Sequence, residues 1–198
     1  MSSLAAELAR DLHQIGAMKF GSFTLKDGRI SPFYVDLRLL ISDPDVLRRS
    51  AAAMVAVARD LAHDRIAGLP YAGLPIAVAM SLASGKPLIY PRKEVKGYGT
   101  QRQIEGAYAA GERILVVDDV ITSGGAKIEG IAPLRAAGLI VEHILVLVDR
   151  SPDRGAALRS HGVTLHSVLR IEDVLTPLHE AGRISDAELA AARSFLAA

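Results

Sequence analysis

The hydrophobic and polar residues of this 198-residue chain alternate between strand-sized and helix-sized segments. Short apolar runs predict strands at 65–68, 87–90, 114–119, 139–149 and 163–169. Amphipathic or small-residue stretches predict helices at 44–62, 76–84, 124–137 and near the C-terminus. Because strands buried on both faces read as continuous apolar runs, the pattern predicts an α/β fold with a mostly parallel central sheet flanked by helices.

The first forty residues have a different pattern. Residues 1–18 mix charges into apolar positions and predict an amphipathic helix. Residues 20–40 alternate β-branched and aromatic side chains around Asp27-Gly28, which predicts a hairpin outside the main sheet. With no repeat and no linker composition along the chain, we expect a single domain over residues 1–198.

Composition and charge narrow the possible functions. The chain has no cysteine, which excludes disulfides, thiolate nucleophiles and cysteine metal sites. With 23 Lys and Arg against 22 Asp and Glu, it shows no charge excess for nucleic acid, so any phosphate binding must be local. No window has the uncharged length of a membrane span or the apolar stretch of a signal peptide. We therefore expect a soluble, cytoplasmic protein that binds neither nucleic acid nor membrane.

The segment ILVVDDVITSGGA, residues 114–126, carries the main chemical signal. Ligands of parallel sheets bind at the carboxyl ends of strands, where Asp118 and Asp119 are expected. The turn over 122–126 opens a helix, and its glycines and unpaired N–H groups favour a phosphate. One sugar phosphate would use both features, the acids holding ring hydroxyls. Alternatively, the acidic pair caps a helix beside an ordinary tight turn.

The full string VVDDVITSGGA resembles the signature of the type I phosphoribosyltransferases, which use phosphoribosyl diphosphate (PRPP). It is neither a Walker loop nor a GxGxxG dinucleotide fingerprint. The resemblance implies PRPP binding by Asp118, Asp119, Val120, Ile121, Thr122, Ser123, Gly124, Gly125 and Ala126. Relatives often carry a hydroxyl residue where Ala126 stands, so backbone donors must make that phosphate contact.

Two segments resemble parts that choose the base. Residues 23–38 are similar to the N-terminal hood of orotate phosphoribosyltransferases, which implies that Lys26 reaches PRPP or orotate and that Phe33 and Tyr34 flank the base. Lys26 taken alone would be a solvated hairpin lysine. Arg150, after the strand LVLVD, matches the arginine that pairs with the base carboxylate, a partner suited to a guanidinium fork. The resemblance also places Thr122 at the orotate.

Two further segments resemble the parts that handle diphosphate. Residues 91–106 are similar to the family's mobile catalytic loop, with Arg92, Lys93, Lys96 and Tyr98 at PRPP, and clustered cations among glycines suit a lid that an anion orders. Tyr98 replaces a frequent histidine, so Lys96 is the better candidate for stabilising the leaving group. Residues 66–75 resemble the diphosphate loop, with Tyr71, Ala72 and Gly73 facing the leaving group. Alternatively, these segments are an exposed basic loop and a tight turn.

The resemblance implies a pentosyltransferase that makes orotidine 5′-monophosphate and diphosphate from orotate and PRPP in de novo pyrimidine biosynthesis. Lys96, Asp118 and Asp119 would be catalytic, and Mg2+ would be held mainly by PRPP rather than by a protein metal site. It also implies a homodimer with a shared lid, a core of approximately residues 41–170, and a hood of approximately residues 1–40 plus part of the C-terminal region. The alternatives are a type I enzyme for another base and a PRPP-sensing regulator.

Overall fold

The computed structural model describes residues 3–25, 28–93 and 103–197. The chain forms two compact units. One consists of Met1–Arg49 together with Leu169–Ala198, and the other of Ser50–Val168. In the described ranges, no helix is both long and apolar enough to cross a membrane.

The unit of Ser50–Val168 is built on a six-stranded sheet with the order β5-β4-β3-β6-β7-β8. The strands are β3 (Arg65–Gly68), β4 (Leu88–Pro91), β5 (Ile104–Glu105), β6 (Arg113–Ile121), β7 (Ile140–Asp149) and β8 (Thr164–Arg170), the last two residues of β8 belonging to the other unit. Strands β4, β3, β6 and β7 pair in parallel, and β5 runs antiparallel to β4. The predicted mostly parallel sheet is therefore confirmed.

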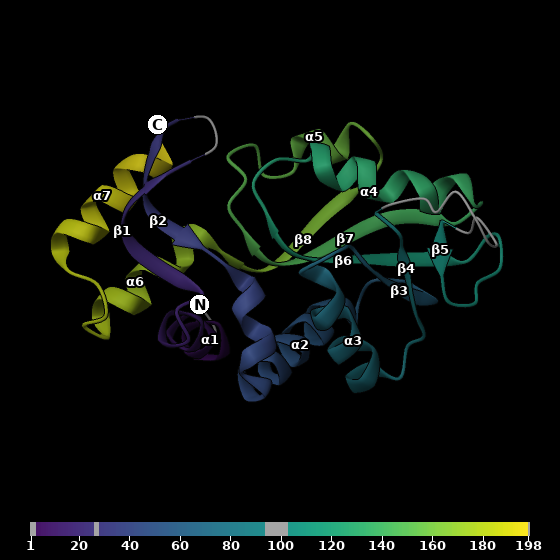
Figure 1. Ribbon diagram of the computed structural model, residues 1–198, viewed down its shortest axis with the longest axis horizontal. Coiled ribbons are helices and arrows are strands. Elements are labelled where there is room, and N and C mark those ends of the chain that lie inside the picture. Colours follow the sequence, from purple (N-terminus) through teal and green to yellow (C-terminus); the bar gives the residue numbers. More distant parts are fainter. Residues whose placement is uncertain (1–2, 26–27, 94–102, 198) are drawn as a thin grey trace. The chain divides into compact units, whose positions relative to one another are not determined.

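Helices cover both faces of this sheet (Figure 1). Helices α4 (Gly125–Ala136) and α5 (Ala156–Arg159) lie on one face, and α3 (Gly73–Ser84) lies on the other. Under α4, buried Val116 and Ile144 of the sheet form a core with Ile131 and Leu134 of the helix. These apolar runs fix the sheet's central strands, so the strand ends are held on a rigid support.

Three segments differ from the prediction. Helix α3 begins at Gly73, three residues before the expected start, and the two short elements β5 and α5 were not predicted. Helix α2 (Pro44–Ala58) ends before residue 62. It begins as expected, because the Asp43 carboxylate accepts the Val46 N–H at 3.0 Å. Short elements carry too little periodicity to be seen in sequence.

The other unit holds the N-terminal hairpin and the C-terminal helices. Its elements are α1 (Ser3–Gln14), β1 (Met18–Thr24), β2 (Ile30–Val35), η1 (Leu37–Ser42), the first residues of α2, α6 (Ile171–Glu180) and α7 (Asp186–Ala197). Strands β1 and β2 form a separate antiparallel sheet, as predicted. The Phe33 ring of β2 meets the Phe195 ring of α7 edge to face at 5.8 Å between centroids, which joins hairpin and helix.

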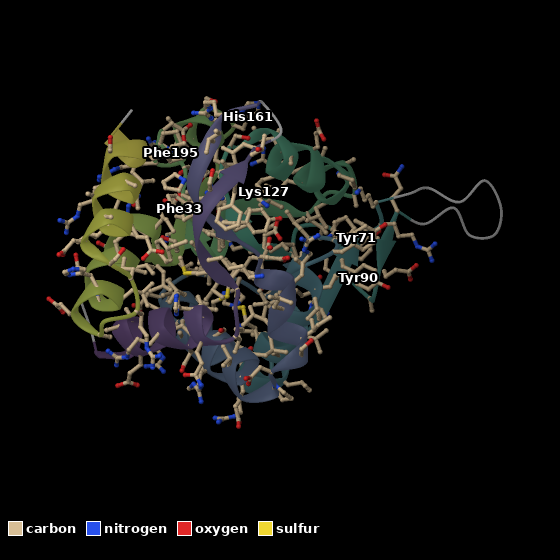
Figure 2. The ribbon with its side chains drawn as sticks, turned by 60° about the vertical axis from the view of Figure 1, so that its left-hand side comes forward. Phe33, Tyr71, Tyr90, Lys127, His161 and Phe195 are labelled. Atoms are coloured by element: carbon tan, nitrogen blue, oxygen red, sulfur yellow. The ribbon has the colours of Figure 1, made fainter. Side chains whose placement is uncertain are left out.

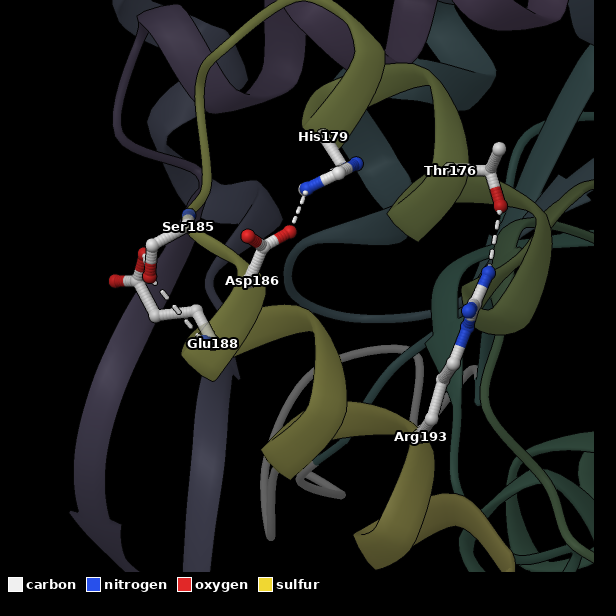
Figure 3. A network of polar contacts seen from close by, with 6 residues as sticks. All are labelled: Thr176, His179, Ser185, Asp186, Glu188 and Arg193. Carbon is white, nitrogen blue, oxygen red and sulfur yellow. Dashed lines mark hydrogen bonds and ion pairs between the residues drawn. The ribbon is translucent and has the colours of Figure 1, made fainter.

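Reciprocal hydrogen bonds start α7 (Figure 3). The Glu188 carboxylate accepts the Ser185 N–H at 2.8 Å, and the Ser185 hydroxyl accepts the Glu188 N–H at 3.3 Å. This capping box satisfies two N–H groups that a helix start leaves unpaired. Nearby, His179 and Asp186 hydrogen-bond at 2.7 Å, which links α6 to α7.

Candidate active site

Asp118 and Asp119 stand near the carboxyl end of β6. Asp118 is only 6% exposed, and both of its carboxylate oxygens have partners. Its Oδ1 accepts the backbone N–H of Asp119 at 2.8 Å, and its Oδ2 forms an ion pair with Nζ of Lys127. Lys127 belongs to the first turn of α4, and Figure 2 labels its side chain. The first acid of the pair is therefore turned into the protein.

Asp119 has the opposite electrostatic situation. Its burial, together with the adjacent carboxylate of Asp118, raises the pKa of Asp119 to about 7. In the described part of the chain, no basic side chain forms an ion pair with Asp119. Since Lys127 neutralises Asp118, Asp119 is the acid of the pair that takes up a proton first near neutral pH.

The turn between β6 and α4 presents small, open residues. Thr122, Ser123, Gly125 and Ala126 are exposed. Among the described residues, no acceptor pairs with the backbone N–H groups of Ser123, Gly124, Gly125 and Ala126. A Cβ at Gly125 would meet nothing within 4 Å, so the backbone there is bare. Four open donors at a helix N-terminus make a ready anion site.

The loop after β3 lies directly against the acid pair. A Cβ placed on Gly73 would lie 2.8 Å from Oδ1 of Asp118 and 2.9 Å from the carbonyl oxygen of Val117. Only glycine fits at this contact. The Pro70–Tyr71 peptide bond is cis, and the backbone N–H groups of Tyr71, Ala72 and Gly73 have no acceptor in the described part of the chain. The structure thus brings the predicted diphosphate loop and the predicted ribose acids together.

Basic side chains line the same region. A cavity of about 500 Å³ is bordered by Asp118, Lys127, Arg92 and Lys93. Arg92 is engaged with Glu105 of β5 in an ion pair, and Nζ of Lys93 lies 5.2 Å from the centre of the Tyr71 ring. Lys96 and Tyr98 lie outside the described residues.

The residues expected to bind orotate fall in different places. Strands β6 and β7 pair at Ile121 and Asp149, so the next residues, Thr122 and Arg150, leave neighbouring strand ends. The backbone N–H of Arg150 donates to the carbonyl of Ile121 at 3.0 Å. These two positions adjoin the acid pair along the sheet edge. Lys26 lies outside the described residues.

The expectation for Phe33 needs correction. Phe33 is 1% exposed, because its ring packs into its own unit against Phe195, and it does not face a ligand. Tyr34 is 38% exposed and lies 5.6 Å from the Phe23 ring between centroids. Adjacent strand residues point to opposite faces, so only one of the two rings can be open.

Sequence reasoning missed Lys127. The lysine lies nine residues after its partner Asp118, and its side chain is 13% exposed. A signal was present, since a cation in the first helical turn is unfavourable beside the helix dipole unless an anion compensates it. The partner could not be chosen without the fold.

The strand order, the acidic strand end and the open loop define the chain as a phosphoribosyltransferase of the type I fold. No family model matches it. The orotate phosphoribosyltransferase of Methanospirillum hungatei is 40% identical over 172 residues, which are 87% of this chain and 98% of that protein. The bifunctional enzyme PyrF/PyrE of Nostoc sp. is 40% identical over 185 residues, which are 93% of this chain and 39% of that protein.

A solved structure agrees with these relatives. The structure of Leishmania donovani UMP synthase matches with a TM-score of 0.90 and 41% identity, over 98% of this chain and 42% of that chain. The chain thus spans about two fifths of the length of the Nostoc and Leishmania proteins and nearly all of the Methanospirillum protein. It belongs to the orotate phosphoribosyltransferase family.

Proposed function

We propose that this chain transfers the phosphoribosyl group of PRPP to orotate, which gives orotidine 5′-monophosphate and diphosphate in pyrimidine biosynthesis. The carrying observation is the set of four unpaired backbone N–H groups next to Asp118 and Asp119 at one sheet edge. Such an edge matches a sugar that carries both hydroxyls and a phosphate. Family membership adds the base, orotate.

Each part of PRPP has a partner in this arrangement. The 5-phosphate accepts hydrogen bonds from the amides of residues 123–126. The ribose hydroxyls donate to Asp119, and the carboxylate stabilises the positive charge that grows on the ring as the diphosphate leaves. The amides of residues 71–73 and the side chains of Arg92 and Lys93 receive the diphosphate. Lys96 completes this role from the lid.

Mg2+ fits the site as a companion of PRPP. Asp118 has no free carboxylate oxygen, and the described residues contain no group of three or more His, Cys, Asp or Glu that could hold a metal ion. An oxygen-seeking ion can instead use the hydroxyls and phosphates of PRPP, with Asp119 as the nearest protein carboxylate. When bound, it neutralises charge on the departing diphosphate.

The base is proposed to lie beside Arg150 and Thr122. The Arg150 guanidinium would pair with the orotate carboxylate, and Thr122 would offer a hydroxyl from the neighbouring strand end. Tyr34 is the exposed hood ring suited to flank the base, and Lys26 is proposed to reach PRPP or orotate. Arg150→Ala should raise the KM for orotate more than the KM for PRPP.

The test is a base panel. Purified protein is incubated with PRPP, Mg2+ and orotate, uracil, adenine or hypoxanthine, and the loss of each base is followed by ultraviolet absorbance. We expect consumption of orotate alone, and its loss in Asp119→Asn. Consumption of a purine or uracil instead would refute the substrate assignment, and PRPP binding without turnover would favour the PRPP-sensing regulator.

A homodimer is proposed from the apolar surface of α3. This helix carries no charged residue, and Val78 is 46% exposed and Leu82 82% exposed. Two such faces could bury each other. Leu82→Glu should convert a dimer to a monomer in light-scattering chromatography. If the lid is shared, mixing Lys96→Ala and Asp119→Asn subunits should recover part of the activity, and no recovery would count against sharing.

A further inference from the structure

Lys127 is a charged side chain in the site to which the proposed reaction gives no task. It is mostly buried, with 13% of its side chain exposed, and its ammonium group is directed at Oδ2 of Asp118. Burying an ammonium group has a large desolvation cost, which only a close anion offsets. Its position at the start of α4 adds an unfavourable helix dipole. The ion pair with Asp118 is therefore what keeps this lysine in the site.

The ion pair leaves Asp118 without a free oxygen. Its Oδ1 already accepts the Asp119 N–H at 2.8 Å, and Gly73 packs so closely on that oxygen that a methyl group would lie 2.8 Å away. Its Oδ2 is taken by Lys127. For Asp118 to accept a sugar hydroxyl, this buried pair would have to open. Asp119 requires no such opening.

We propose that Lys127 is a positioning residue: it holds Asp118 against the protein and leaves Asp119 as the carboxylate that accepts the ribose hydroxyls. This inference rests on the proposed function, in that it takes this sheet edge to bind a ribose phosphate. It divides the two adjacent acids into a support and a ligand-binding group.

The electrostatics agree with this division. Two adjacent carboxylates disfavour each other's ionised form, so one of them tends to hold a proton. The Lys127 charge opposes that effect and helps to keep Asp119 ionised. Removing the ammonium group should therefore leave the acid pair protonated more often and less able to accept two hydroxyls.

The test is a double-mutant cycle with two probes. Ribose 5-phosphate reports on hydroxyl and phosphate contacts, and inorganic phosphate reports on the phosphate loop alone. Their dissociation constants are measured by calorimetry for the unaltered chain, Lys127→Met, Asp118→Asn and the double variant. The ratio of the two constants isolates recognition of the sugar. Lys127→Arg and Lys86→Met serve as the charge-conserving variant and the control, since Lys86 donates to the carbonyl of His63 instead of to an acid.

In Lys127→Met, we expect ribose 5-phosphate to bind about tenfold more weakly relative to inorganic phosphate, as for a shift of about one pKa unit in the acid pair. Lys127→Arg should restore most of the ratio, and Lys86→Met should not change it. In the Asp118→Asn background, Lys127→Met should leave the ratio unchanged, because the carboxylate that Lys127 positions is gone.

Two results would overturn the proposal. If Lys127→Met weakens both probes by the same factor, Lys127 binds the anion itself. If the effects of Lys127→Met and Asp118→Asn on the ratio multiply, Lys127 acts independently of Asp118. Should Lys127→Met unfold, the double variant, which buries no unpaired charge, decides the matter against Asp118→Asn. All these are binding measurements, so they can fail while the unaltered chain still consumes orotate, and the converse also holds.

Discussion

Gly73→Ala is the substitution whose effect follows most directly from the geometry of the site. The added methyl group would lie 2.8 Å from Oδ1 of Asp118, 2.9 Å from the Val117 carbonyl oxygen and 3.0 Å from Cα of Asp118. Ordinary contacts between such atoms lie near 3.5 Å, so loop and strand must separate by about 0.5–1 Å. Neither neighbour is a flexible side-chain end, so the strain cannot be relieved by a rotamer change.

Two quantities measure this strain. Overpacking of this kind costs about 1–3 kcal/mol, and a cost of about 2 kcal/mol lowers the unfolding temperature of a chain this size by about 4–8 °C. A misplacement of about 1 Å can slow an enzyme about a hundredfold, so we expect kcat/KM for PRPP to fall at least about tenfold.

Differential scanning fluorimetry and steady-state consumption of orotate check the two expectations. Gly125→Ala is the matched control for stability, because its methyl group meets nothing within 4 Å and its unfolding temperature should not fall. If Gly73→Ala keeps both the unfolding temperature and kcat/KM of the unaltered chain, the diphosphate loop does not press on the acid pair and the site geometry is wrong.

Three further predictions follow from single groups. Since Asp119 accepts hydroxyls as a carboxylate and its pKa is raised to about 7, ribose 5-phosphate affinity should rise between pH 6 and pH 8, and calorimetry of Asp119→Asn should show that rise removed. Because this folded-state pKa exceeds the ordinary value of 3.8, stability should fall as pH rises from about 4 to 7; a pH series of unfolding temperatures that is parallel for Asp119→Asn and the unaltered chain would contradict this. Ser185→Ala should cost about 1 kcal/mol by removing the α7 cap and leave ribose 5-phosphate affinity unchanged, as measured by urea unfolding and calorimetry.

The main sheet was predictable because its strands are buried on both faces. The run at 114–119 is apolar up to Asp118, and the structure extends it only to Arg113–Ile121 as β6. Strand β5 escaped prediction because it has two residues and owes its existence to pairing with β4. Elements of that length are defined by partners that lie elsewhere in the sequence.

The site was predictable where one segment carries the chemistry and not where side chains meet across the fold. Open amides and adjacent acids follow from the order of residues in 118–126, since a strand end, a small-residue turn and a helix start are consecutive. The ion pair of Lys127 with Asp118 depends on how α4 returns over β6. For Phe33 and Tyr34, the strand alternation already placed the two rings on opposite faces, and burial by α7 decided which one is open.

The most direct measurement is a crystal structure of the chain with ribose 5-phosphate. The account predicts the phosphate within hydrogen-bonding distance of the backbone N–H groups of residues 123–126, with the ring hydroxyls at the Asp119 carboxylate and the Lys127–Asp118 pair still closed. A phosphate bound elsewhere, with those four amides left facing solvent, would contradict it.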